Sequence, residues 1–107
     1  MKTKNIFHIT KNELSNTTEF FEKLHESGDI LIERIISTGQ VTPKDIWLSQ
    51  NRNEWVVLLQ GNAKLEFEGS DCIEINQGDY IYIPVLKKHR VIYTSTTPPC
   101  IWLAVHF

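Results

Sequence analysis

Four polar side chains have the chemistry of a binding or catalytic site: a carboxylate, two imidazoles and an amide, at Glu54, His89, His106 and Gln50. Gln50 and Glu54 flank the short connection 51–53, so in a strand–turn–strand segment their side chains could converge on one point. Such a set suits a borderline divalent metal such as iron, manganese, nickel or zinc. Two imidazoles with one carboxylate are also the facial ligands of non-haem iron. The residues therefore suggest either one divalent transition metal at these four positions or a metal-free site.

Each of these side chains also has an ordinary structural explanation. Glu54 could be a strand-end carboxylate that accepts backbone N–H groups, and His89 could be a hydrogen-bonded histidine near a cavity mouth. Gln50 suits a hydrogen-bonding pocket residue better than a metal ligand. His106 shares one face of the last expected strand with Trp102, so it points either into a cavity that Trp102 helps to line or to the surface.

Arg34 and Glu33 are supporting candidates on an earlier strand. The Arg34 guanidinium could reach a carboxylate-bearing ligand or balance the charge of Glu54. It could equally be a solvated arginine on a strand.

The composition is that of one ordinary globular domain of 107 residues, 41% hydrophobic and 22% charged. The net charge of -2 argues against a nucleic-acid partner, because phosphate binding requires a basic excess. No apolar run approaches the roughly 20 residues that span a bilayer, and the N-terminus has no signal-peptide stretch. We therefore expect a cytoplasmic protein with neither nucleic acid nor membrane as partner. Cys72 and Cys100 are expected as free thiols in or near the core, with a disulfide as the alternative.

Most of the chain has the pattern of short β-strands, rich in Val, Ile, Tyr, Phe and Trp and separated by turn residues. The expected strands are 6–9, 30–36, 45–50, 54–60, 63–69, 72–75, 80–84, 89–94 and 100–107. Gly61 and Asn62 predict a tight hairpin between the strands of 54–60 and 63–69. Many short strands at close intervals favour an all-β fold, either a β-sandwich or a barrel-like jelly roll.

One helix is expected ahead of these strands, over residues 15–28. Its apolar residues at helical spacing are Phe20, Phe21 and Leu24. Asn16 is the candidate N-cap with Glu19 three residues later, and Gly28 could end the helix in the left-handed conformation. The chain is then a single domain, 1–107, with an N-terminal strand and helix in 1–28 and a barrel in 30–107.

Residues 55–59 are apolar on both faces of their expected strand. An antiparallel strand that is covered on both faces needs a second layer outside its sheet. The N-terminal helix could supply part of this layer and a partner subunit the rest. The sequence therefore predicts a homodimer that buries the outer face of this sheet.

Two motifs resemble those of the cupin superfamily. In EWVVLLQG, Glu54 and Gly61 stand at the spacing of the glutamate and the glycine of the first cupin motif. In GDYIYIPVLKKH, Gly78, Pro84 and His89 match the glycine, the proline and the histidine of the second motif. The segments IERIISTGQ and WLAVHF extend the resemblance to a group of small single-domain bacterial cupins.

The resemblance implies a cupin-type jelly-roll β-barrel with one N-terminal helix, and a cavity faced by Glu54 and His89. Typical cupins hold a metal there through these two residues and two further histidines. In this chain, Leu48 and Gln50 stand at the positions of those histidines. Two of the four usual ligands therefore carry over, and a metal site would need His106 together with Gln50 to complete it.

Three functions are open at this point. The first is a small-molecule enzyme in which Glu54 and His89 are catalytic, either by holding a metal or as general base and acid, as in epimerases and isomerases. The second is a non-catalytic, metal-free module that binds a small molecule, and the third is a structural or regulatory dimer. The expected ligand contacts are Gln50, His106, Trp102, Arg34 and Tyr93, the last of which stands where the second motif usually ends in Asn.

Overall fold

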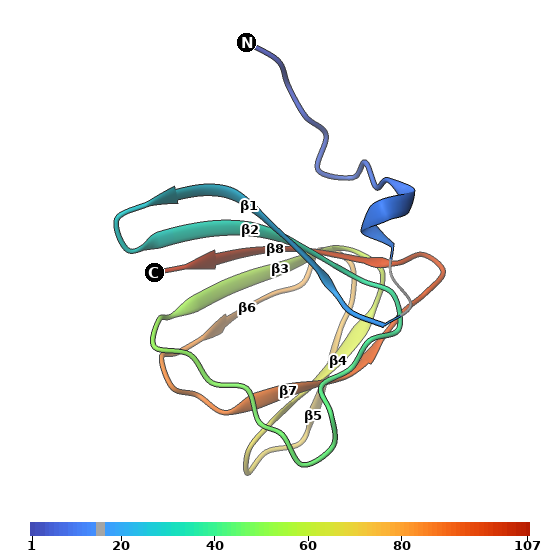
Figure 1. Cartoon of the computed structure of the whole chain (residues 1–107). Helices are drawn as coiled ribbons and strands as arrows, with labels where there is room; N and C mark the ends of the chain where they lie inside the picture. The colour runs from blue at the N-terminus through green and yellow to red at the C-terminus, as the bar shows by residue number, and fades with distance from the viewer. Residues whose placement is uncertain (15–16) are drawn as a thin grey trace.

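The protein is a two-sheet jelly roll, seen here in a computed structural model that describes residues 1–14 and 17–107 (Figure 1). Its strands are β1 (Phe20–Ser27), β2 (Ile30–Ser37), β3 (Glu54–Gln60), β4 (Ala63–Phe67), β5 (Cys72–Ile75), β6 (Tyr80–Ile83), β7 (His89–Thr94) and β8 (Cys100–His106). The larger sheet has the order β1-β2-β8-β3-β6 and the smaller one the order β5-β4-β7, with antiparallel pairing throughout. The all-β class predicted from the sequence is confirmed.

The strands from β2 onward begin at the predicted residues and end within two residues of the predicted ends. Two short predictions are wrong. Residues 6–9 form no strand, because the chain turns there and the His8 N–H donates to the Asn5 carbonyl at 3.1 Å. Residues 45–50 form only an isolated bridge, in which Leu48 and His89 exchange backbone hydrogen bonds of 2.7 and 3.0 Å.

The helix predicted over residues 15–28 is also wrong, because Phe20–Ser27 is strand β1, which pairs with β2 along its length. Gly28 does adopt the left-handed conformation, with φ +57°, but it does so with Asp29 in the two-residue turn of the β1–β2 hairpin. The helical structure of the described residues is η1 (Lys11–Glu13), a single 3-10 turn. The proposed N-cap, Asn16, lies outside the described residues.

The reason for this error is that pairing with β2 outweighs the local spacing of apolar residues. Phe20, Phe21 and Leu24 fit a helical stripe, but β1 is an edge strand on which Phe21 and Leu24 stay largely exposed. Strand preference depends on neighbours across the sheet more than on the segment itself. The N-terminal part of the chain therefore belongs to the large sheet.

Gly61 and Asn62 connect β3 to β4 but do not close a hairpin, contrary to the prediction. β3 pairs with β6 and β8, whereas β4 pairs with β5 and β7, so this turn carries the chain from one sheet to the other. Gly61 has φ +92°, and a Cβ there would lie 2.7 Å from Ser95 Oγ and 3.0 Å from Cys100 Sγ. A glycine is needed at this crossing because the backbone is left-handed and because there is no space for a Cβ.

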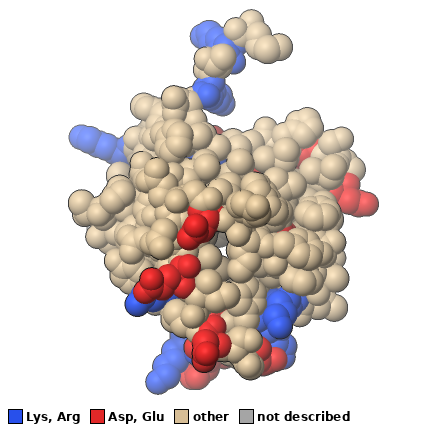
Figure 2. Space-filling view, turned by 180° about the vertical axis from the view of Figure 1, so that it is seen from behind, with Lys and Arg blue, Asp and Glu red and all other residues tan. Residues whose placement is uncertain are grey.

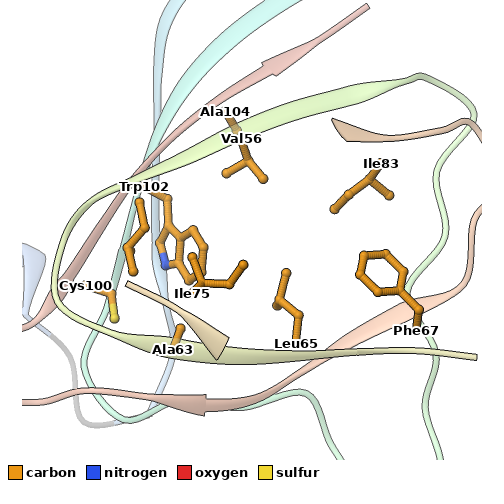
Figure 3. Close-up of a cluster of buried hydrophobic side chains, with 10 residues drawn as sticks. Val56, Ala63, Leu65, Phe67, Ile75, Ile83, Cys100, Trp102 and Ala104 are labelled. Carbon is orange, nitrogen blue, oxygen red and sulfur yellow. The ribbon is translucent and has the colours of Figure 1, made fainter. Parts of the chain in front are cut away.

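The hydrophobic core fills the space between the two sheets. Figure 3 shows side chains of β3 and β8 pointing towards those of β4. Burial alternates along β4, with Ala63, Leu65 and Phe67 buried. Both cysteines are free, as expected. Cys100 lies in the core, but Cys72 is exposed, so the expected core position holds for only one of them.

The N-terminal segment is fastened to the outer face of the large sheet by Arg34. This side chain is buried, and its Nε donates to Glu22 at 2.8 Å while its Nη2 donates to Glu13 at 3.1 Å. Its Nη1 donates to the backbone carbonyls of Ile6, at 3.1 Å, and His8, at 2.6 Å. Four acceptors thus enclose one guanidinium, which holds the segment around η1 against β2.

The molecular surface carries mixed charges. On the face shown in Figure 2, basic and acidic side chains are interspersed over the lower half, and the segment that projects at the top carries basic side chains. Within residues 1–14 and 17–107, no helix is long and apolar enough to cross a membrane.

Candidate functional site

A cavity of about 140 Å³ lies between the two sheets. Its apolar walls include Val56, Leu65 and Trp102. Its polar lining residues are Glu19, Glu33, Gln50, Glu54, His89 and His106. The structure therefore brings together the four polar residues that the sequence singles out for chemistry, along with Trp102 and the supporting candidate Glu33, and adds Glu19 to them.

Glu54 is the first residue of β3 and is only 7% exposed. The Gln50 amide Nε2 donates to Glu54 Oε1 at 2.8 Å. Gln50 reaches Glu54 because the segment before β3 is held in place by its backbone: Leu48 bridges to His89, and the Gln50 carbonyl accepts from the Leu86 N–H at 2.8 Å. One carboxylate oxygen of Glu54 is thus occupied, and the other has no described protein partner.

His89 begins β7 and is 5% exposed. Its Nδ1 lies 2.9 Å from the backbone carbonyl oxygen of Lys87. Because a carbonyl oxygen only accepts hydrogen bonds, Nδ1 must carry a proton. In the neutral ring, Nε2 is then an unprotonated acceptor, which is the state that a general base requires.

His106, at the end of β8, is also buried, at 5% exposure. Its Nε2 lies 2.7 Å from Oε1 of Glu33 on the neighbouring strand β2. Its Nδ1 is buried and has no hydrogen-bond partner among the described residues. The open question whether His106 faces the cavity or the surface is answered in favour of the cavity.

Glu19 is a cavity residue that the sequence analysis missed. It accepts a short hydrogen bond from the Ser37 hydroxyl, which in turn accepts from the Trp102 indole N–H at 3.1 Å. Burial raises the pKa of the Glu19 carboxyl above its ordinary value of 4.5, and the bond from Ser37 acts in the opposite direction. Its position could have been found from the two-residue spacing of Glu19 and Phe21, which both line the cavity as alternate residues of an extended chain do.

Two of the expected ligand contacts, Arg34 and Tyr93, do not line this cavity. Arg34 lies on the opposite face of the large sheet from Glu33, so it cannot balance the charge of Glu54. It borders a separate hollow of about 680 Å³ under the N-terminal segment, where its guanidinium is already bound by four acceptors. Tyr93, on β7, is 42% exposed.

The cavity residues fit a transition metal poorly. No group of three or more His, Cys, Asp or Glu side chains in the described part of the chain is arranged to hold a metal ion. Two reasons lie in the residues at the usual ligand positions: Leu48 has no ligand atom, and Gln50 is a neutral amide, which is a poor ligand for these metals. His106 would have to bind a metal through Nδ1, since its Nε2 is held by Glu33.

The sheets, the cavity and the two motifs together define a jelly-roll barrel with an internal site. Residues 35–106 match the family model described as a Cupin domain, so this chain belongs to the cupin family. Among curated proteins, none matches the chain in sequence.

Three solved structures illustrate the likeness. A Ralstonia eutropha JMP134 protein, described as a candidate mannose-6-phosphate isomerase, is 36% identical, with a TM-score of 0.90 over 99% of this chain and 97% of that chain. A cupin superfamily protein from Desulfitobacterium hafniense DCB-2 is 16% identical, with a TM-score of 0.70 over 84% of this chain and 77% of that chain. A polyketide cyclase from Streptomyces resistomycificus is 17% identical, with a TM-score of 0.73 over 99% and 78%. The last two establish likeness of fold alone.

Proposed function

We propose that this cupin binds a small polar molecule in the barrel cavity and that Glu54 and His89 transfer a proton on it without a metal. The observation that carries the proposal is the bond from His89 Nδ1 to the Lys87 carbonyl, which leaves Nε2 as the basic atom of a buried imidazole. Glu54 lines the same cavity, with one oxygen held by Gln50. An imidazole and a carboxylate that face one bound molecule are suited to general acid–base catalysis.

Proton transfer of this kind underlies isomerisation and epimerisation. The description of the 36% identical relative as a candidate isomerase agrees with that reaction class. The sugar phosphate in that description suits the present cavity less well, because the described lining residues include no Lys or Arg to bind a phosphate. The proposal therefore takes over the class of reaction and leaves the substrate open.

A divalent metal, whether iron, manganese, nickel or zinc, is not part of the proposal. Gln50 would have to act as a ligand beside Glu54, His89 and His106, and no group of three or more His, Cys, Asp or Glu side chains in the described residues is arranged to hold a metal ion. Non-catalytic binding of a small molecule in the same cavity is the second candidate. It is favoured by the protein contacts that already hold one oxygen of Glu54 and the Nδ1 of His89.

A fragment screen followed by proton-exchange measurement separates these candidates. Small carbonyl and hydroxy compounds are screened for binding by thermal shift, and each one that binds is incubated with protein in D₂O. We expect wild-type protein to replace a carbon-bound proton of at least one of them by deuterium, seen as a lost ¹H NMR signal.

Matched variants define what the exchange depends on. Glu54→Gln and His89→Asn should abolish it while the fragment still binds, and Glu74→Gln on exposed strand β5 should leave it unchanged. Binding without exchange in the wild-type protein would support the non-catalytic candidate. The absence of any fragment bound in the cavity would overturn both.

We further propose that the protein is a homodimer through the outer face of the large sheet. Val57 and Trp55 lie on that face of β3 and are half-buried, and Tyr80 and Tyr82 of neighbouring β6 are 69% and 52% exposed. The N-terminal segment covers the part of the face near Arg34 and leaves this part open. A cytoplasmic location accords with two free cysteines.

Light scattering on a sizing column tests the dimer. We expect twice the chain mass at micromolar concentration, and a monomer for Val57→Asp. A wild-type monomer under these conditions would contradict the proposal.

A further inference from the structure

The ionisable lining of the cavity is mostly acidic. Glu19, Glu33 and Glu54 all line it, and no Lys or Arg is present among its described lining residues. Carboxylates that are withdrawn from water need donors or positive charge nearby. A ligand with a negative charge would add to the repulsion in the cavity, whereas a ligand with a positive charge would relieve it.

The hydrogen-bond donors of the cavity are mostly directed at the protein itself. The Gln50 amide donates to Glu54 at 2.8 Å, and the Trp102 indole N–H donates to Ser37 at 3.1 Å. His89 Nδ1 donates to a backbone carbonyl. What remains for a ligand is one N–H of Gln50 and a larger set of acceptors, namely carboxylate oxygens and His89 Nε2. The cavity is therefore arranged to receive a molecule that donates.

His106 independently indicates that the cavity receives a hydrogen-bond donor. It lines the cavity at 5% exposure, and its Nε2 lies 2.7 Å from Glu33 Oε1. Because a carboxylate accepts, Nε2 carries a proton, and Nδ1 of the neutral ring is then an acceptor. This buried Nδ1 has no partner within residues 1–14 and 17–107. Buried polar atoms are rarely left in that state, and a donor on a ligand would satisfy it.

We propose that the cavity selects a small organic ammonium ion, such as a short primary alkylamine in its protonated form, over neutral and anionic molecules of the same size. This inference rests on the proposed function, because it names the ligand class of the same cavity. The apolar walls formed by Val56, Leu65 and Trp102 match a short alkyl chain, and an indole face attracts a cation. The volume of about 140 Å³ limits that chain to a few carbons, since sites for drug-sized molecules measure roughly 300–1,000 Å³.

Three molecules of similar size and different charge test this selection: n-propylammonium chloride, 1-propanol and sodium propionate. Each is titrated into ¹⁵N-labelled protein, and binding is followed at the backbone amides of β3, β7 and β8. We expect propylammonium to bind at least tenfold more tightly than propanol, with no binding of propionate. Glu54→Gln should weaken propylammonium binding about tenfold and leave propanol binding unchanged.

Glu74→Gln is the matched control, because it makes the same change of charge on exposed strand β5 outside the cavity lining. It should leave both affinities unchanged. Equal losses in Glu54→Gln and Glu74→Gln would assign the effect to long-range charge and overturn the inference. Propanol or propionate binding in the cavity as tightly as propylammonium would overturn the inference and leave the proposed function standing. Binding of none of the three would overturn the inference, whereas the proposed function stands or falls with the separate fragment screen.

Discussion

Glu54 and His106 stand directly opposite each other on the neighbouring strands β3 and β8, and both line the cavity. Residues in such positions have Cβ atoms roughly 4.5–5.5 Å apart, so a carboxylate and an imidazole share one wall. Glu33, on strand β2, holds the same imidazole from the other side at 2.7 Å. This wall of the site is therefore built on three adjacent strands, which position side chains more rigidly than loops do.

The Glu33–His106 contact should contribute measurably to stability. Glu33→Ala leaves the buried Nε2 of His106 without its acceptor, and we expect a loss of about 1–3 kcal/mol in the free energy of unfolding. Urea denaturation followed by tryptophan fluorescence measures this loss. Glu26→Ala is the control, because Glu26 pairs with Lys23 at 3.5 Å on the exposed surface and should cost about 0–1 kcal/mol. Equal losses for the two variants would contradict the structural role of the contact.

Glu19 should make stability depend on pH in a defined direction. Burial raises the pKa of its carboxyl in the folded state above 4.5, so the folded protein binds this proton more tightly than the unfolded chain does. The resulting stabilisation is fully present below pH 4.5 and is lost as the pH rises through the raised pKa. Glu19→Gln removes the titrating carboxyl and with it this dependence on pH.

Urea melts across a pH series measure the effect as the difference in unfolding free energy between wild type and Glu19→Gln. As the pH increases above 4.5, the unfolding free energy of the wild type should fall relative to that of Glu19→Gln. A difference that stays constant with pH would show that Glu19 titrates alike in both states.

The crossing between the two sheets should tolerate no side chain at Gly61. An alanine there would need both a left-handed backbone and a Cβ within 3.0 Å of Ser95 and Cys100. Gly69 has a similar φ of +79°, but nothing lies within 4 Å of its Cβ position. We expect Gly69→Ala to cost about 1–2 kcal/mol and Gly61→Ala to cost about 1–3 kcal/mol more. Thermal unfolding compares them, and similar melting temperatures would rule out the steric contribution.

Ligand binding should be independent of transition metal. No group of three or more His, Cys, Asp or Glu side chains among the described residues is arranged to hold a metal ion, and Leu48 has no ligand atom. Protein purified without a histidine tag should contain less than a stoichiometric amount of metal by elemental analysis. EDTA treatment should leave fragment affinity unchanged. Stoichiometric metal that disappears in folded Glu54→Ala and His89→Ala would instead support the four-residue metal site.

The strands from β2 onward could be predicted because the residues of each segment themselves show where a strand begins and ends. Alternation in residues such as Ala63, Leu65 and Phe67, with glycines between the runs, marks both the strands and their ends. Strand β1 could not be recognised from apolar spacing, since Phe20, Phe21 and Leu24 also fit a helix. The Gly28–Asp29 pair was the better signal, because two such residues between extended runs favour a hairpin.

The cavity was partly predictable for a related reason. Glu54 and His89 stand at fixed spacings within two motifs, so their common location could be expected from the sequence. Glu33 was a supporting candidate, whereas Glu19 was not expected as a cavity residue, because its partner Ser37 is far away along the chain. The role of Arg34 could not be predicted, because it depends on which face of β2 the side chain occupies. The pairing of β2 with β1 and β8 determines that face.

The most direct test of the account is to map where a bound fragment contacts the protein. Amide chemical shifts of ¹⁵N-labelled protein are recorded during titration with the tightest-binding compound of the screen. We predict that the largest changes occur at Glu54, His89 and His106, with little change at Tyr80 and Tyr82 on the outer face. Changes confined to the outer face, or to the segment held by Arg34, would contradict the assignment of the barrel cavity as the functional site.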